Sequence, residues 1–279
     1  NSPDAVKGNR ADKCDMSKAA FQAEENGCID MTGSEDEIIV GMRELISMLP
    51  LNNESDVYTD ECEDDLNRVC ENLSAMKGDP RYVLSEISDD HIFFETKAEY
   101  AKNMVTGFIK LNGMTVGAVA NCSEVYDEEG NKAEEFDAVL TTKGCEKAAE
   151  FVQYCDAFSI PVLTITNVNG FCNCQCAEKK LAKALARLTY ALANATCAKV
   201  NLITGQAFGS AYAIMNSKSL GADLVYAWPE AKVGMMDASM AAKIMYPNAD
   251  AVELKEKAAE YENLQSNIMS AAARGYVDL

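Results

Sequence analysis

The chain of 279 residues has little histidine, few basic residues and no long apolar run. His91 is the only histidine, which disfavours Ser/His and Cys/His nucleophilic systems. No apolar run approaches the roughly 20 residues of a membrane span, and the first residues do not resemble a signal peptide. No Gly-Lys-Ser/Thr follows a glycine-rich stretch, so a P-loop is excluded. The absence of a membrane span and of a signal peptide, together with the scattered cysteines described below, predicts a cytoplasmic protein.

Basic residues are outnumbered, with 25 Lys and Arg against 44 Asp and Glu, for a net charge of −19. Such an acidic chain would repel the phosphates of a nucleic acid, which excludes that class of partner. The charge does not exclude a small anionic ligand, because glycine loops and helix N-termini attract anions locally. Hydrophobic residues make up 48%, as in a globular protein with a substantial core.

The eleven cysteines are odd in number and scattered, which favours reduced thiols over a disulfide framework. Only "FCNCQC" concentrates them, with Cys172, Cys174 and Cys176. A metal site is conceivable there, but the spacing is not C-x2-C and no fourth ligand is evident, since His91 is remote. We therefore expect ordinary loop residues and no metal.

The first 90 residues are polar and contain one clear helix signal. Ser34 with Glu37 forms a capping box, and Pro50 stops the helix. Its apolar residues fall on one face: Ile38, Met42, Leu45 and Ile46. Residues 60–74 fit either a short helix or an exposed acidic segment. No stretch of this part predicts a strand.

From about residue 91 the pattern becomes that of an α/β protein. Residues 103–122 alternate like two strands joined at Asn112-Gly113. The further elements expected are helices at 142–159, 178–195 and 210–218, and strands at 160–168, 199–204 and 222–229. Leucines 181, 185, 188 and 192 form a helical stripe that indicates core packing. Alternating strands and helices predict a mainly parallel sheet covered by helices.

The two ends of the chain resemble each other. "AEENGCIDM" (23–31) and "AAARGYVDL" (271–279) share a helical lead-in followed by Gly, a variable residue, Ile or Val, and Asp. This echo predicts two copies of one structural unit, with only the tail of the first copy present. The ends of the chain would then be cut sites and not natural domain edges.

Two glycine loops carry the predicted chemistry. A helix beginning near Gly209 leaves its first N–H groups without internal partners at an electropositive end. The small residues Gly209, Ser210 and Ala211 would let an oxygen approach those amides, as in an oxyanion hole. A second loop, with Gly170 and Phe171, follows the preceding strand and should lie on the same rim of the sheet. Spacing alone leaves open whether these glycines merely close tight turns.

Several motifs together resemble one family. They are "FFE", "VTGF", "CDAFSIP", "GQAFGSAY" and "LGADLVYAWP", and the resemblance extends over essentially the whole chain. In this order they are similar to the carboxyltransferase subunit of biotin-dependent acyl-CoA carboxylases and decarboxylases. The resemblance implies an α/β fold of the crotonase-like (ClpP/crotonase, ββα-superhelix) type. It also implies two such domains in the complete protein.

Domain boundaries and site residues follow from the resemblance. Residues 1–90 would be the end of the N-terminal domain plus connecting helices, and 91–279 the C-terminal, biotin-side domain. The backbone amides of Gly209, Ser210 and Ala211 would form the oxyanion hole. The implied biotin contacts are Gly170, Phe171, Gly205, Phe208 and Tyr212.

The resemblance also implies the cofactor and the partners. Carboxybiotin on a carrier protein would exchange its carboxyl group with an acyl-CoA through an enolate. The implied partners are a biotin carboxyl carrier protein, a biotin carboxylase and the N-terminal carboxyltransferase domain of another chain in a homo-oligomer. The acyl group cannot be read from the sequence; acetyl-, propionyl-, methylmalonyl- and glutaconyl-CoA enzymes share these motifs.

The chain departs from the family's sequence pattern at both glycine loops, and three alternative functions stay open. Gly-Ser-Ala replaces the family's common Gly-Gly-Ala, and "CNCQC" replaces a Pro-Gly-containing insertion after "NGF". The chain could belong to a decarboxylase, or be a non-catalytic assembly subunit. A crotonase-like hydratase or isomerase would need a positioned glutamate, for which Glu178 and Glu230 are the nearest candidates.

Overall fold

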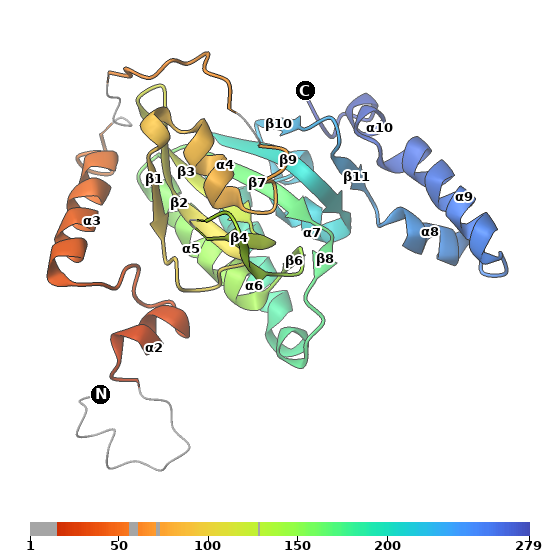
Figure 1. The fold of residues 1–279 in the computed structure, drawn as a ribbon, viewed down its shortest axis with the longest axis horizontal. Coiled ribbons are helices and arrows are strands. Elements are labelled where there is room, and N and C mark those ends of the chain that lie inside the picture. The colour runs from red at the N-terminus through yellow and green to blue at the C-terminus, as the bar shows by residue number, and fades with distance from the viewer. Residues whose placement is uncertain (1–15, 56–60, 71–72, 128) are drawn as a thin grey trace, which may run out of the picture.

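A seven-stranded sheet forms the centre of the molecule, seen in the computed structural model in Figure 1. The structure describes residues 16–55, 61–70, 73–127 and 129–279. The strands of this sheet are β1 (Phe93–Thr96), β2 (Met104–Leu111), β3 (Met114–Asn121), β7 (Val162–Val168), β9 (Lys199–Phe208), β10 (Leu224–Ala227) and β11 (Lys232–Gly234). Their order is β1-β2-β3-β7-β9-β10, and β11 pairs with the later part of β9. The sheet is antiparallel from β1 to β3 and parallel from β3 to β10.

Helices cover both faces of the sheet, and two separate two-stranded sheets accompany it. The helices are α2 (Ala19–Glu24), α3 (Glu35–Met48), α4 (Pro80–Ile87), α5 (Thr142–Ala157), α6 (Gln175–Asn194), α7 (Gly209–Ile214), α8 (Ala238–Met245), α9 (Ala251–Tyr261) and α10 (Ile268–Ala273). The small pairs are β4 (Glu124–Tyr126) with β5 (Lys132–Glu135), and β6 (Val139–Leu140) with β8 (Gly170–Phe171). Short helical turns occupy Asp89–His91, Lys218–Leu220 and Glu262–Ser266.

The predicted hairpin is confirmed. Asn112 and Gly113 form its two-residue turn, with φ of 53° and 76°. Positive φ at both central residues is what the type I′ turn requires, and its twist matches that of the flanking strands. The turn sets β2 and β3 in register from Met104 opposite Asn121 to Leu111 opposite Met114.

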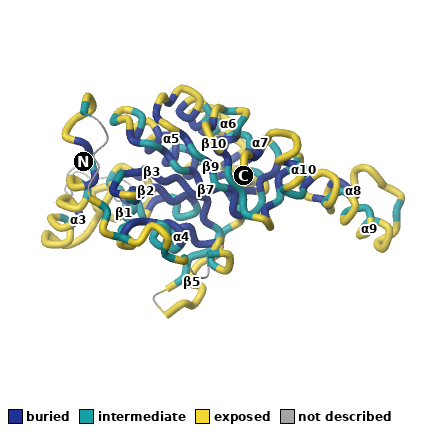
Figure 2. The backbone as a smooth tube through the Cα atoms, turned by 90° about the horizontal axis from the view of Figure 1, so that it is seen from above, coloured by how far each residue is buried: buried dark blue, intermediate teal, exposed yellow. Residues whose placement is uncertain are grey.

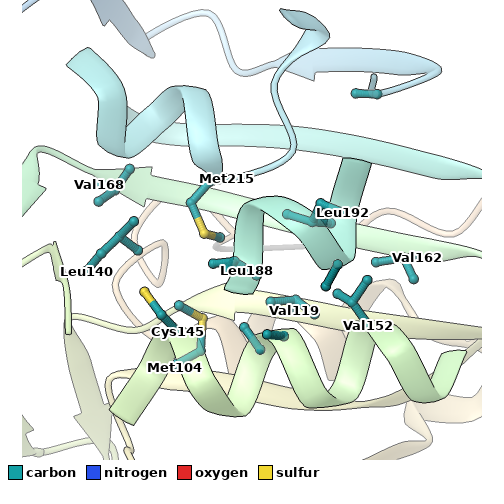
Figure 3. Packing of buried hydrophobic residues seen from close by; sticks show 14 of the residues in the cluster. Met104, Val119, Leu140, Cys145, Val152, Val162, Val168, Leu188, Leu192 and Met215 are labelled. Atoms are coloured by element: carbon teal, nitrogen blue, oxygen red, sulfur yellow. The ribbon is translucent and has the colours of Figure 1, made fainter. Parts of the chain in front are cut away.

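Two apolar clusters hold the helices to the sheet. The larger one joins α5 and α6 to one face, and Figure 3 shows Leu188, Leu192, Val152 and Met215 within it. The smaller one packs Val83 and Leu84 of α4 against the other face. The predicted leucine stripe is therefore core packing, although α6 begins three residues earlier than expected, at Gln175.

Close helix–sheet packing depends on one glycine of β3. A Cβ placed on Gly117 would lie 2.4 Å from the Cys155 sulfur of α5, so no larger residue fits without displacing the helix. At the end of α6, the buried Lys199 ammonium donates hydrogen bonds to the Leu192 and Ala195 carbonyls, both at 2.9 Å. These carbonyls have no partner within the helix, so the lysine closes its C-terminus.

The N-terminal part lies beside the sheet and adds no strand among its described residues. The helix predicted from Ser34 is present as α3, with both hydrogen bonds of the capping box to Glu37. Of the ambiguous segment at 60–74, residues 61–70 and 73–74 are described and form no helix. Figure 1 shows α2 and α3 at the edge of the body, and Figure 2 shows most of α3 exposed, although Met48 in its last turn belongs to the larger cluster. Val40 and Ile46 are exposed by 65% and 66%.

The C-terminal arm, formed by α8, α9, the Glu262–Ser266 turn and α10, projects from the opposite side (Figure 1). The sequence analysis predicted no element between 230 and 270. The arm returns to the sheet where Lys232 of β11 pairs with Asn267. Apolar side chains remain exposed along it: Met235, Met240, Ile244, Met245, Val252, Leu264 and Met269. Within the described residues, no helix is both long and apolar enough to cross a membrane.

The two echoing segments have similar local geometry. Each begins in the last turn of a six-residue helix, α2 or α10, and continues to a left-handed glycine, Gly27 at φ 63° or Gly275 at φ 77°. Each then runs on as extended chain that bonds to the domain body, through Lys97 N to Asp30 O and Asp278 N to Val225 O. The shared turn explains the sequence echo. Whether residues 1–90 belong to a separate first domain stays a prediction.

Candidate active site

Both glycine loops lie at the carboxyl ends of adjacent parallel strands. The Gly170–Phe171 pair follows β7 and forms β8, while Gly209 follows β9 and begins α7. α7 contacts both β8 and β9, so the two loops meet, as the crossover argument predicted. This edge of a parallel sheet is where α/β proteins bind ligands.

Gly209 has a backbone conformation that favours glycine. Its φ is 61°, and a Cβ there would lie 3.0 Å from the Met235 carbonyl oxygen. The strand thus enters α7 through a sharp turn that a larger residue would strain. Gly209 is therefore needed for the backbone turn itself, whatever else the loop does. The spacing of the glycines alone did not show this.

The first amides of α7 point toward the N-terminus of the helix and have no acceptor within it. The N-cap residue is Phe208, whose side chain cannot accept a hydrogen bond, so no side chain caps the helix. Among the described residues, the amides of Ser210 and Ala211 make no hydrogen bond outside the regular ladders. Amides in the first turn have no acceptor within the helix. They can therefore donate to an oxygen that approaches the N-terminus of α7.

The predicted contact residues divide into an exposed rim and a buried support. Ser210 is exposed, and Gly170 has no atom within 4 Å of its Cβ position, so space is open at both loops. Phe208, Ala211 and Tyr212 are buried, with exposures of 4%, 1% and 8%. The Tyr212 hydroxyl is buried without a hydrogen-bond partner, and burial raises its pKa to about 12. Phe208 and Tyr212 thus support the loop from below and do not line an open surface.

β9 is longer than predicted. We expected it to end at Thr204, but it continues to Phe208 and includes Gly205. Pairing with β7 jumps from Thr166 opposite Ile203 to Val168 opposite Ala207. The extra residues of β9 bulge out at Gly205, and the strand then resumes toward the turn at Gly209. Gly205 therefore shapes the approach to the site from within the sheet.

Two asparagines that the sequence analysis missed hold this bulge. The Asn167 side-chain oxygen accepts a hydrogen bond from the Gln206 amide at 3.0 Å. The Asn167 backbone amide in turn donates to the Asn121 side-chain oxygen at 3.3 Å. A Cβ on Gly205 would lie 2.5 Å from the Asn167 side-chain oxygen, so the glycine leaves room for this side chain. The sequence signal that could have revealed this contact is an asparagine near the end of each of two neighbouring strands.

The acid–base candidates lie elsewhere or face solvent. Glu178, in the first turn of α6, and Glu230, after Pro229, are both exposed. The His91 side chain is 52% exposed and lies 3.5 Å from a carboxylate oxygen of Glu86. None of these groups is buried beside the α7 amides as a tuned general base would be. The arrangement offers backbone donors for a developing negative charge.

Cavities and cysteines add no metal centre to this site. Two cavities, of about 580 and 620 Å³, lie between the 28–45 segment and β1, and α7 lines neither. In the part of the chain that the structure describes, no group of three or more His, Cys, Asp or Glu side chains is arranged to hold a metal. Cys172 lies in the loop, Cys174 is the N-cap of α6, and Cys176 is in its first turn.

Comparison with solved structures identifies the class of protein. Transcarboxylase 12S, in a crystal structure with methylmalonyl-coenzyme A and methylmalonic acid bound, superposes with a TM-score of 0.88 and 31% identity. The match covers 99% of this chain and 55% of that one. The chain is therefore an α/β protein of the crotonase-like fold, as the resemblance implied.

Sequence comparison gives the family. The model described as "Carboxyl transferase domain" matches residues 4–279, and the chain belongs to that family. It is 36% identical over 284 residues to a putative propionyl-CoA carboxylase beta chain of Bacillus subtilis (strain 168), covering 98% of this chain and 54% of the relative. It is 36% identical over 268 residues to the methylmalonyl-CoA decarboxylase subunit alpha of Propionigenium modestum, covering 91% and 50%. The chain thus spans about half the length of these relatives.

Proposed function

We propose that this chain is the biotin-facing part of an acyl-CoA carboxyltransferase. It would take part in moving a carboxyl group between carboxybiotin on a carrier protein and an acyl-CoA. Residues 91–279 would form the biotin-side domain, and 1–90 the end of the preceding domain with its connecting helices. Family membership supports the carrier and acyl-CoA partners, and the exposed apolar faces of α3 and the arm support association with further protein.

The observation that carries the proposal is the pair of first-turn amides of Ser210 and Ala211 without a capping side chain, beside the left-handed Gly209. Carboxybiotin, when bound, supplies carbon dioxide as negative charge gathers on its ureido oxygen. The α7 amides would donate to that oxygen. Preorganised donors of this kind contribute roughly a hundredfold or more to rate each. The open space at Gly170 fits a flat ring approaching the same rim.

The direction of transfer stays open between two members of this proposal. Relatives include both a carboxylase beta chain and a decarboxylase subunit, at 36% identity each. We therefore propose carboxyl transfer in general, with a decarboxylase subunit as the second candidate. The homo-oligomer, the biotin carboxylase partner and the cytoplasmic location also stay predictions.

The test joins this chain to an N-terminal carboxyltransferase domain and follows biotin-dependent loss of malonyl-CoA. We expect Gly209→Val and Ala211→Val to lower turnover by about 100-fold, since the first strains the turn that presents the amides and the second overpacks the buried residues beneath them. Ser210→Ala is the matched control, because it keeps the amide and adds no bulk.

Three results would overturn the proposal. Unchanged turnover in both valine variants would remove the α7 amides from the reaction. Hydration of a crotonyl thioester without biotin would favour a hydratase. Stable oligomers without turnover in any combination would indicate an assembly subunit.

A further inference from the structure

The cysteines of "FCNCQC" have no role in the proposed carboxyl transfer, and they form no metal site among the described residues. Its cysteines lie between β8, which ends at Phe171, and α6, which begins at Gln175. The Cys172 and Cys174 sulfurs are 3.4 Å apart. Among the described cysteines, this is the one pair whose sulfurs lie within hydrogen-bonding distance of each other, and both are free thiols.

We propose that Cys172 and Cys174 form a reversible thiol–disulfide pair, with Cys174 as the attacking thiol and a low-molecular-weight disulfide as the oxidant. The inference goes beyond the proposed function and does not depend on it.

The backbone holds both cysteines in place. The Cys172 amide donates to the Leu140 carbonyl at 2.9 Å, which extends the β6–β8 pairing by one residue. Cys174 is the N-cap of α6, and its sulfur accepts from the Ala177 amide at 3.4 Å. The sulfurs need to approach by little more than 1 Å to reach the S–S length of about 2.05 Å. No long loop has to close, since only Asn173 lies between them.

The environments of the two thiols assign their roles. Cys174 is exposed at the start of a 20-residue helix, where the N-terminal amides favour a thiolate. The hydrogen bond from the Ala177 amide lowers the pKa of Cys174 below its ordinary value, and the neighbouring Cys172 thiol acts in the same direction. Cys172 is half-buried and packs against the larger apolar cluster. The exposed thiolate is thus the nucleophile, and the less accessible Cys172 resolves the adduct.

The exchange balances in two steps. The Cys174 thiolate attacks one sulfur of the small disulfide, forms a mixed disulfide and releases one small thiolate. Cys172 then gives up its proton, and its thiolate attacks the Cys174 sulfur, which releases the second small thiolate. The protein loses two protons and two electrons, equivalent to two hydrogen atoms, and the small disulfide is reduced to two thiols. A dithiol reductant reverses both steps.

The experiment treats the reduced full chain with glutathione disulfide, alkylates the remaining thiols and maps them by mass spectrometry. For the unmodified chain, we expect loss of two hydrogens, protection of Cys172 and Cys174 from alkylation, and recovery with dithiothreitol. Cys172→Ser should trap glutathione on Cys174. Cys174→Ser keeps an N-cap residue, so the helix start is preserved, and it should slow modification of Cys172 by at least tenfold. Cys176→Ser is the matched control and should behave like the unmodified chain.

Three outcomes would overturn the proposal. The first is full alkylation of Cys172 and Cys174 after glutathione disulfide treatment. The second is a disulfide that uses Cys176 and disappears in Cys176→Ser. The third is the absence of a trapped adduct on Cys174 in Cys172→Ser. Circular dichroism of each variant separates loss of fold from loss of chemistry.

Discussion

The side-chain oxygen of Asn167 accepts a hydrogen bond from the Gln206 amide across the break in β7–β9 pairing, at 3.0 Å. This contact replaces the ladder bond that the bulge of β9 removes, and it directs the strand toward Gly209. The position of the α7 amides therefore depends on an asparagine that lies outside the helix.

Replacing Asn167 should weaken both the fold and the site. Asn167→Ala leaves the Gln206 amide without its acceptor, so we expect a loss of about 1–3 kcal/mol in the free energy of unfolding. Biotin-dependent turnover in the complete enzyme should fall as well, because the α7 turn loses its support. Urea denaturation and the malonyl-CoA assay measure the two effects. Asn167→Asp retains the acceptor and should lie close to the parent; if it matches Asn167→Ala, the hydrogen bond is not the cause.

Gly209→Ala should lower activity more than its cost in stability explains. An alanine at φ 61° costs about 1–2 kcal/mol, and here its Cβ would also lie 3.0 Å from the Met235 carbonyl oxygen. The matched control is Gly130→Ala in the β4–β5 hairpin, where φ is 80° and no atom lies within 4 Å of the Cβ position. We expect reduced turnover only in Gly209→Ala. Equal turnover in the two variants would show that the turn does not shape the site.

The glutamate of the "FFE" motif has a structural partner. Glu95 of β1 accepts two hydrogen bonds from the Arg81 guanidinium of α4, at 2.8 and 2.9 Å. The side chains of Arg81 and Glu95 are 21% and 15% exposed, so Arg81→Met should cost somewhat less than the about 3–5 kcal/mol of a fully buried pair. The double variant Arg81→Met with Glu95→Leu should recover most of that loss in thermal denaturation. Additive losses would mean that the pair is not coupled.

Alkaline pH should destabilise the reduced protein. Burial raises the pKa of Cys145 from 9.0 to about 12, and that of Cys122 and Cys197 to about 11. The folded state thus holds protons that the unfolded chain releases above pH 9. Stability is complete below that pH and falls as pH rises toward the folded pKa values, by about 1.4 kcal/mol per pH unit for each thiol.

The measurement is the free energy of unfolding against pH in the presence of a reductant. Cys145→Ala should reduce the alkaline slope by about one proton, since one buried thiol is gone. Cys176→Ala serves as the exposed-cysteine control. An alkaline slope that is the same in Cys145→Ala as in the parent would contradict the assignment to buried thiols.

Local signals predicted most of the central fold. The capping box at Ser34, the Asn112-Gly113 turn and the leucine stripe of α6 each specify geometry within a few residues, and each is confirmed. The parallel pairing of β7 with β9 followed from the alternation of strands and helices. These elements needed no knowledge of distant contacts.

Contacts between distant segments account for what the sequence did not predict. Gly205 predicts the end of a strand. In the structure, Asn167 of the neighbouring strand accepts a hydrogen bond from the Gln206 amide, and β9 continues to Phe208. α7 was expected to reach residue 218 and ends at Ile214, where Asn216 turns with φ 51° and bonds to Thr164 of β7. Cys174 read as a loop residue because cysteine is not among the usual N-caps. The predicted start of α7 identified the amides of the site, but their orientation depends on the bulge of β9, which the sequence did not predict.

β11 lies beside the second half of β9, and the residue after it, Met235, places its carbonyl against Gly209. The projecting C-terminal arm begins close to that same residue and returns to β11 through Asn267. The arm therefore joins the domain beside the Gly209 turn. A change in how the arm packs on the domain would therefore reach the Met235 carbonyl and, through it, the turn that presents the α7 amides.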